Sequence, residues 1–328
     1  MKAQCRLSPI YARTPEDIIT NDDLATITDT SDAWIVSRTG IRERCKLAAD
    51  ENASDLGLAA SRRALDGAGL DAQELTHIIT ATCTQDELSP SIACILAGGL
   101  GAGPVMAFDF NAACSGFLYG LSLVRAILVE NLQARILFVC AEALTRRLNW
   151  TDRSTCVLFG DGASACVCSG ESRAGDAVLE DVICQSDGAL NRLITVGGGT
   201  SCAYAPGQAV GPEFFLSMNG RETYRHAVRR MTDVCAHILE RNGLRMKDVD
   251  LFVPHQANIR IIEAVGNRLG ADSGRVFTNV ERYGNTSSAS IPLALAQARE
   301  EGRVEPGCRV LATAFGAGLT WGAALLRF

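Results

Sequence analysis

Apolar residues fall into blocks that predict helices and buried strands in alternation. A helix is expected over 54–65, because Ser54 can cap it and Gly67 or Gly69 can end it. The run 76–83 is rich in Ile, Thr and Ala without alternation, which is typical of a strand covered on both faces. ARILFVCAEA (134–143) predicts another strand. This alternation predicts an α/β fold built around a sheet.

The remaining blocks continue this pattern to the end of the chain. The helix expected over 114–128 is apolar nearly all round, so it should be central and buried. The segment 185–213 is rich in Gly, Ser and Pro, and it predicts either an excursion over a site or a linker. Further strands are expected at 105–110, at two places within 154–169 on either side of a turn, and at 308–314 and 321–327.

The order of these blocks repeats once along the chain. A helix, a turn at Gly69 and a strand recur around Gly243, and Arg135 aligns with Arg309 in a later strand. Both pairs have the same offset in sequence number, 174 (from 69 to 243 and from 135 to 309), which favours a duplicated α/β protein over chance similarity. The predicted halves are 1–172 and 173–328.

Length and charge narrow the possible functions. The chain has 328 residues, enough for two units of about 150 residues each. Its formal charge of −6 and the lack of a strongly basic segment argue against a nucleic-acid partner. No run of about 18 uncharged apolar residues occurs, so no membrane span is expected, and the N-terminus lacks a signal-peptide core. We therefore expect a cytoplasmic protein.

Thirteen cysteines are present, and most are expected to be reduced side chains that fill space in the core. No C-x-x-C pair occurs, and Cys166 and Cys168 alternate as residues on one face of a strand would. Because zinc and iron–sulfur sites need closely spaced sets of ligands, no metal is expected.

Two residues stand at strand ends, where α/β proteins place their chemistry. Cys114 follows a predicted strand and opens the long apolar helix, where the helix dipole and free N–H groups would favour a thiolate. It could also be one more buried cysteine. His255 lies at the carboxyl end of the apolar strand DLFVP, whereas His77, His226 and His237 fall inside expected helices or strands.

Two further segments allow both a structural and a chemical interpretation. Asn285, within RYGNTSSASIP, could cap the next helix or form a turn, or its amide could donate to a developing oxyanion. The segment FGAGLTWG (315–322) could present backbone N–H groups to a ligand or only turn the chain, and it lacks the P-loop pattern.

Taken together, these motifs resemble the β-ketoacyl-acyl carrier protein synthase III family of thiolase-fold ketosynthases. The resemblance rests on NAACSGF around Cys114, PHQAN around His255 and GNTSSASIP around Asn285. It extends to TSDAWIVSRTGIRER (30–44), TDR (151–153), FGDGA (159–163) and the terminal GLTWGAALLRF. It implies an internally duplicated fold with α-β-α-β-α layers. The chain departs from the family over its first twelve residues and at Ala317, where GAG stands for a common GGG.

The resemblance also implies an activity, the decarboxylative condensation that starts fatty acid synthesis. Cys114 would take the acyl group from a short acyl-CoA, with the N–H groups of Cys114 and Ala317 around the oxyanion. His255 and Asn285 would donate hydrogen bonds to the enolate formed when malonyl-acyl carrier protein loses carbon dioxide. The product would be a 3-oxoacyl-acyl carrier protein. No cofactor is expected, because coenzyme A enters only as a thioester substrate.

Five residues carried over from the family would bind coenzyme A. Trp34 and Arg153 would hold the adenine, and Arg38 would contact the phosphates. Gly220 and Asn258 would lie along the pantetheine arm.

The same resemblance implies two protein partners. Arg225, Arg260 and Arg268 would attract the acidic acyl carrier protein. A second copy of the chain would form a homodimer, with the strand near 108–111 as the edge through which the sheet continues. Ser89 would then close the acyl pocket across the dimer, and its small size predicts tolerance of primers longer than acetyl.

Three other functions stay open at this point. Papain-type cysteine hydrolases share the order Cys114, His255, Asn285 and a comparable separation of the cysteine from the histidine, but their C-G-(S/A)-C-(W/Y) signature is missing here. A non-catalytic member of the fold would be expected to have lost one of the three residues. A condensing enzyme of specialised metabolism that acylates another partner fits the same motifs.

Overall fold

The computed structural model describes residues 4–199 and 209–328 and has a ten-stranded sheet at its centre. The strands run in the order β12-β13-β14-β9-β1-β8-β7-β5-β6, and β2 pairs with β8. Those of the first half are β1 (Arg6–Leu7), β2 (Tyr11–Arg13), β5 (His77–Ala81), β6 (Met106–Phe110), β7 (Arg135–Glu142) and β8 (Gly162–Ser169). Those of the second half are β9 (Ala177–Ser186), β12 (Leu251–Pro254), β13 (Arg309–Gly316) and β14 (Thr320–Arg327).

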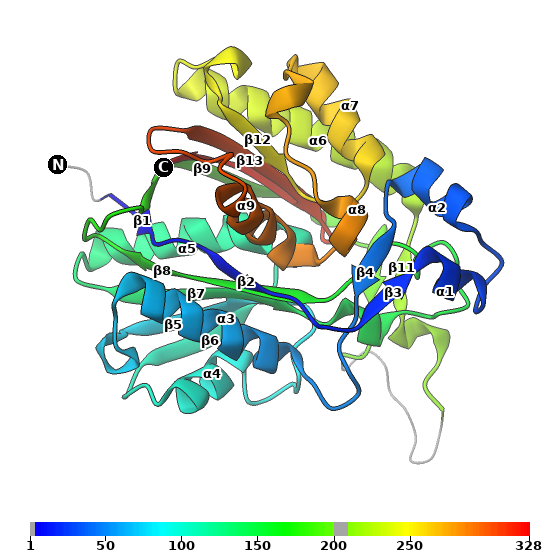
Figure 1. Ribbon diagram of the computed structural model, residues 1–328, viewed down its shortest axis with the longest axis horizontal. Helices are drawn as coiled ribbons and strands as arrows, with labels where there is room; N and C mark the ends of the chain where they lie inside the picture. The colour runs from blue at the N-terminus through cyan, green and yellow to red at the C-terminus, as the bar shows by residue number, and fades with distance from the viewer. Residues whose placement is uncertain (1–3, 200–208) are drawn as a thin grey trace.

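Helices form three layers around this sheet. They include α3 (Ala53–Ala68), α4 (Ile92–Leu100) and α5 (Gly116–Glu130), followed by α6 (Gly220–Arg241), α7 (Ile259–Leu269) and α9 (Ser290–Glu300). Figure 1 shows α3 and α4 on one outer face, α6 and α7 on the other, and α5 and α9 between the two parts of the sheet. This arrangement confirms the predicted α-β-α-β-α layers.

The two halves repeat their elements at the offset predicted from the sequence. β7 and β13 begin at Arg135 and Arg309, the pair aligned above, and they have the same length. α5 and α9 keep this offset, as do the 3-10 turns that precede them, η2 (Ala113–Ser115) and η8 (Ser287–Ala289). β1 pairs with both β8 and β9 and so joins the halves. The exact boundary between 172 and 173 stays a prediction.

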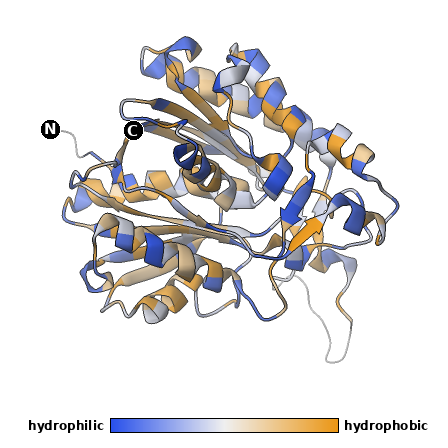
Figure 2. Cartoon of the chain, viewed as in Figure 1, coloured by the Kyte–Doolittle hydropathy of each residue, from blue (hydrophilic) through white to orange (hydrophobic). Residues whose placement is uncertain are grey.

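The central position of α5 depends on small residues. A Cβ atom on Gly120 would lie 2.0 Å from Cζ of Phe138 on β7, so a larger residue cannot fit without a shift. Phe117 stacks on the same ring with centroids 5.8 Å apart. Figure 2 shows hydrophobic residues along the strands on both sides of the central helices. The segment Ala113–Glu130 is long and apolar enough to cross a membrane by length and composition alone, but here it packs against β7, β9 and β14 as a core helix.

Two predicted elements differ from the structure. The helix expected to be capped by Ser54 begins at Ala53, and the Asp55 carboxylate accepts a hydrogen bond from the N–H of Asn52 (2.8 Å). Only one strand, β8, forms within 154–169, because the Asp152 carboxylate accepts hydrogen bonds from the main chain and hydroxyl of Ser154 (2.9 and 2.6 Å) and folds the preceding residues into turns.

Shorter elements complete the chain around this core. β3 (Ile18–Thr20) pairs with β4 (Glu43–Cys45), and α1 (Asn21–Ala25) and α2 (Asp32–Thr39) lie between them in sequence. β10 (Ile194–Val196) and β11 (Leu216–Met218) form a hairpin, and α8 (Val280–Tyr283) precedes the η8 turn. Within the segment 185–213, the described residues of β10 pair with β11, which fits the predicted excursion, and residues 200–208 lie outside the described residues. Within the atypical first twelve residues, the described part from residue 4 supplies β1 and the start of β2.

Candidate active site

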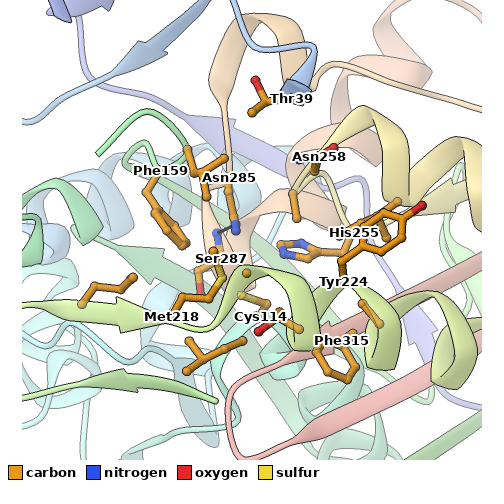
Figure 3. A pocket seen from close by; sticks show the side chains of 18 of the residues that line it. Thr39, Cys114, Phe159, Met218, Tyr224, His255, Asn258, Asn285, Ser287 and Phe315 are labelled. Atoms are coloured by element: carbon orange, nitrogen blue, oxygen red, sulfur yellow. Dashed lines mark hydrogen bonds between the residues drawn. The ribbon is translucent and has the colours of Figure 1, made fainter. Parts of the chain in front are cut away.

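A cavity of about 700 Å³ is lined by residues of both halves, among them Cys114, His255 and Asn285. Cys114 lies in η2 after β6, His255 directly follows β12, and Asn285 lies two residues before η8. Figure 3 shows the three side chains turned toward the same space. The structure therefore brings together the three residues predicted to carry the chemistry.

Burial controls the state of the Cys114 thiol. It raises the pKa of Cys114 to about 12, while hydrogen bonds with Ser287 and Asn285 act in the opposite direction and the nearby Glu142 carboxylate adds to the rise. Burial therefore opposes the thiolate that was expected at this helix N-terminus. The physical reason is that α5 begins only at Gly116, and desolvation outweighs the favourable contacts. The thiol must lose its proton during attack.

Two strained turns meet at this site. Ala113 and Ser287 have φ angles of 46° and 50°, which residues with a Cβ atom rarely adopt. A left-handed conformation costs such a residue about 1–2 kcal/mol. The two positions are related by the offset of the duplication and directly precede Cys114 and Ser288, so both halves keep the same strained turn beside the cavity.

His255 is held at both its main chain and its ring. Its N–H donates to the Thr313 carbonyl (2.7 Å), which continues the pairing of β12 with β13. The ring Nδ1 lies 2.5 Å from Oγ of Ser290, whereas Nε2 is buried and has no partner among the described residues. Burial lowers the pKa of His255 to about 3, so the ring is neutral at neutral pH.

Asn285 presents one defined end of its amide to the cavity. Its main chain bonds with Leu158 (N–H to carbonyl, 2.8 Å) and with the N–H of Gly160 (3.1 Å). The side-chain Oδ1 accepts a hydrogen bond from the N–H of Ser287 (2.8 Å). Because the oxygen is occupied in this way, the NH₂ group is the end that is available as a donor.

The turn between β13 and β14 closes on Cys114 from the other half. A Cβ atom on Gly316 would lie only 2.7 Å from the Cys114 nitrogen, so this close approach requires glycine. The Thr320 hydroxyl lies 3.0 Å from the Ala112 carbonyl and 3.1 Å from that of Ala317, which ties the turn to the loop before Cys114. Ala317 lines the cavity and is not among the described residues with positive φ, so its methyl group is tolerated there.

All five residues predicted to bind coenzyme A line this cavity. The guanidinium groups of Arg38 and Arg153 lie 4.8 and 4.6 Å from the ring centroid of Trp34. Gly220 begins α6. Asn258 caps α7, because its side-chain oxygen accepts a hydrogen bond from the N–H of Arg260 (2.9 Å). The positions fit an elongated ligand that reaches from Trp34 to Cys114.

The residues predicted to face protein partners are more scattered. Arg260 lines the cavity and donates to the Ser37 carbonyl (2.7 Å). Arg225 and Arg268 are exposed on α6 and α7 and are not part of the cavity lining. Ser89 is also exposed and does not line the cavity of its own chain. Their roles stay predictions.

A buried carboxylate beneath the site was not predicted by any motif. Glu142, at the end of β7, is 0% exposed and accepts hydrogen bonds from the hydroxyls of Thr84 and Ser288 (both 2.7 Å) and from the N–H of Cys83 (3.1 Å). It therefore ties the loop after β5 to the η8 turn. In residues 4–199 and 209–328, no group of three or more His, Cys, Asp or Glu side chains is arranged to hold a metal ion.

The apolar wall of the cavity was also missed, because its members come from separate segments. The β10–β11 hairpin contributes one side, and residues after β7 contribute the other. The wall consists of Leu144, Leu158, Phe159, Ile194, Val196, Leu216 and Met218. Of these, only Ile194 and Val196 on β10 fall in the segment 185–213, which was expected to be an excursion over a site or a linker.

Comparisons with known proteins agree with this geometry. Family models described as 3-oxoacyl-acyl-carrier-protein synthase III and its C-terminal part match residues 108–188 and 239–328. A beta-ketoacyl-acyl-carrier-protein synthase III from Nitratidesulfovibrio vulgaris is 55% identical over 99% of this chain and 98% of its own.

Solved structures give the same result. The 3-oxoacyl-acyl-carrier-protein synthase III of Aquifex aeolicus is 40% identical, with a TM-score of 0.90 over 99% of this chain and all of its own. The priming beta-ketosynthase of the R1128 polyketide pathway is 33% identical, also with a TM-score of 0.90, over 100% of this chain and 97% of its own. By its full-length similarity to these enzymes, the chain belongs to the β-ketoacyl-acyl carrier protein synthase III family, which has the thiolase fold.

Proposed function

We propose that this protein starts fatty acid synthesis by condensing a short acyl-CoA with malonyl-acyl carrier protein. The observation that carries the proposal is the convergence of Cys114, His255 and Asn285 on one cavity. The reaction needs a nucleophile for the thioester and two neutral donors for the enolate. The buried thiol, the neutral imidazole and the amide have these properties.

In the first half-reaction, the sulfur of Cys114 attacks the thioester carbonyl of acyl-CoA. The bond between the acyl carbon and the CoA sulfur breaks, and the thiol proton of Cys114 leaves with CoA as its thiol. The N–H groups of Cys114 and Ala317 stabilise the negative oxygen of the tetrahedral intermediate. Because burial raises the pKa of Cys114 to about 12, proton loss accompanies the attack.

In the second half-reaction, the malonyl group loses carbon dioxide, and the electron pair of the broken C–C bond forms a thioester enolate. The Asn285 amide and a ring N–H of His255 donate to its oxygen. A neutral imidazole is a far weaker acid than an imidazolium, so its N–H can hydrogen-bond to the enolate oxygen without readily protonating the carbon. The enolate carbon then attacks the acyl carbonyl, the bond to Cys114 breaks, and the released thiolate takes up one proton from water.

Coenzyme A would lie along the cavity wall formed by the five predicted contact residues, from Trp34 to Asn258. Both guanidinium groups lie close to the centroid of the Trp34 ring (4.8 and 4.6 Å), so the adenine would share this ring with them. Arg153, which donates to the Asp29 carbonyl at the surface (2.6 Å), would stack on the outer face of the adenine.

Three features of the assembly are part of this proposal. The protein works in the cytoplasm, and Arg260 at the cavity, with Arg225 and Arg268 on the same half, attracts the acidic carrier protein. Two copies pair through the edge strand β6, which has β5 as its single neighbour in the described sheet. Each copy then brings Ser89 to the acyl pocket of the other.

The proposal is tested by following free CoA thiol and carbon dioxide in purified enzyme. With acetyl-CoA and malonyl-acyl carrier protein together, both should be released continuously in equal amounts. With acetyl-CoA alone, CoA release should stop at about one equivalent per chain, because the acyl group stays on Cys114. Continuous CoA release without the malonyl substrate would instead indicate a hydrolase.

A second candidate is a condensing enzyme of specialised metabolism. The similarity to the priming ketosynthase of the R1128 polyketide biosynthetic pathway favours it, because that enzyme has the same fold and serves another biosynthetic route. An assay of acceptor preference separates the two. Preference for a carrier protein other than that of fatty acid synthesis would support the second candidate.

A further inference from the structure

Ser290 places a buried hydroxyl against His255, and the mechanism above does not use it. The residue is the first of α9, is 2% exposed, and has its Oγ 2.5 Å from Nδ1 of His255. The equivalent position in the first half, at the offset of the duplication, is Gly116, which has no side chain. The hydroxyl is therefore specific to the half that carries the histidine.

The surroundings of Ser290 fix the direction of this hydrogen bond. The N–H of Gln256 points at the Ser290 oxygen (3.4 Å), which keeps a second lone pair and its own hydrogen. Among residues 4–199 and 209–328, Nδ1 of His255 is the atom found within hydrogen-bond distance of Oγ that could accept this hydrogen. If Nδ1 donated instead, the hydroxyl hydrogen would have no acceptor there, so the geometry favours Ser290 as the donor.

This direction determines which ring nitrogen carries the proton. A neutral imidazole has one N–H, and a nitrogen that accepts a hydrogen bond cannot also hold it. With Nδ1 accepting, the N–H belongs to Nε2. That atom is buried, lacks a partner among the described residues, and belongs to a ring that faces the cavity beside Asn285, as Figure 3 shows.

We propose that Ser290 is a positioning residue that locks His255 in the Nε2–H tautomer, so that the ring can donate to the enolate oxygen. The opposite tautomer would turn a lone pair of Nε2 toward that oxygen and repel it. The catalytic consequence rests on the proposed function, whereas the tautomer itself does not.

The kinetic test uses the pair Ser290→Ala and Ser290→Thr. Ser290→Ala should slow decarboxylation about tenfold or more, as expected for loss of an oxyanion donor, and leave acyl loading of Cys114 within about twofold. Ser290→Thr keeps the hydroxyl and should recover most of the loss. Ser61→Ala removes another fully buried serine hydroxyl, on α3, which has no hydrogen-bond partner in the described part of the chain, and controls for burial alone. Equal loss of both half-reactions in Ser290→Ala, without recovery in Ser290→Thr, would overturn the proposal.

A second measurement does not depend on activity. Nitrogen-15 NMR of histidine-labelled enzyme distinguishes a protonated from an unprotonated ring nitrogen, and the spectrum of His255→Ala assigns the signal among the four histidines. The unmodified protein should show Nε2 protonated and Nδ1 unprotonated, and Ser290→Ala should show a mixture. A protonated Nδ1 in the unmodified protein, or an unchanged tautomer in Ser290→Ala, would contradict the proposal. If the protein proves to have no condensing activity, this tautomer result still stands or fails by itself.

Discussion

Burial keeps both Cys114 and His255 uncharged, although it moves their pKa values in opposite directions. It raises the pKa of the thiol to about 12 and lowers that of the imidazole to about 3. Cysteine hydrolases instead depend on a thiolate beside a protonated histidine. A neutral pair suits a site whose second step forms a carbanion, and the residue chemistry therefore favours condensation over hydrolysis.

The buried histidine should make the protein sensitive to acid. The pKa of His255 is about 3 in the folded state and about 6.5 when unfolded, so the unfolded chain binds an extra proton as the pH falls below 6.5. This group therefore contributes stability above pH 6.5 that is lost progressively toward pH 3. From pH 7 to pH 5, the free energy of unfolding of the unmodified protein should decrease. The decrease should be smaller by about 2 kcal/mol in His255→Gln, which lacks this titrating group. Urea unfolding at both pH values measures this, and equal falls would contradict it.

The two donors should matter more for decarboxylation than for acyl loading. His255→Ala and Asn285→Ala should each reduce decarboxylation of malonyl-acyl carrier protein by about a hundredfold, because each removes one donor to the enolate. Acyl loading of Cys114 should change much less. Carbon dioxide release and the rate of acyl-enzyme formation, followed separately, measure the two steps. Equal losses in both would argue against the assigned roles.

The positions of the strained turns η2 and η8 beside the cavity depend on the helices that follow them. α5 can start beside the sheet because Gly116 and Gly120 have no side chain, and it carries Cys114 to the cavity together with the Ala113 turn. The duplication places the η8 turn opposite, where Ser287 and Asn285 reach the same thiol. Two copies of one structural unit thus supply the nucleophile on one side and the donors on the other.

Two helical glycines test how closely α5 must approach the sheet. Gly120→Ala should lower the free energy of unfolding by about 1–3 kcal/mol, because its Cβ would lie 2.0 Å from the Phe138 ring. Gly98→Ala in α4 is the matched control, since nothing lies within 4 Å of its Cβ, and it should raise stability by about 0.5–1 kcal/mol. Urea unfolding compares them. A change of the same sign and size in both would refute the packing argument.

The sequence predicted elements better than the contacts between them. Apolar blocks and the repeated offset located β7, β13 and the central helix, and short motifs located Cys114, His255 and Asn285. Ser290 was not singled out, because its role requires contact with a residue 35 positions away. The strand expected before Phe159 was wrong, since the local hydrogen bonds of Asp152 outweigh the apolar pattern there.

The described chain leaves one edge of its sheet uncovered. Met106 on the edge strand β6 is 58% exposed, and Leu88, next to Ser89, is 76% exposed. An unpaired edge strand with an exposed apolar side chain can pair with another copy, as proposed above for β6. In the proposed dimer, the acyl pocket would be complete only in the assembled protein.

Substitution of Ser89 should change which primers are used. In the dimer, Ser89→Phe should fill the acyl pocket and lower the kcat/KM for butyryl-CoA about tenfold, because overpacking costs about 1–3 kcal/mol. The kcat/KM for acetyl-CoA should stay nearly unchanged. Ser89→Ala is the control and should keep the primer range of the unmodified protein. A primer range that is the same in all three proteins would show that Ser89 does not face the pocket.

The most direct test of the proposed function is the mass of the intact protein after treatment with acetyl-CoA. The chain has 13 cysteines, and we predict one acetyl adduct, found after digestion on the peptide that carries Cys114. Cys114→Ala should remain unmodified under the same conditions. An adduct on another cysteine, or one that persists in Cys114→Ala, would contradict the assignment of Cys114 as the nucleophile.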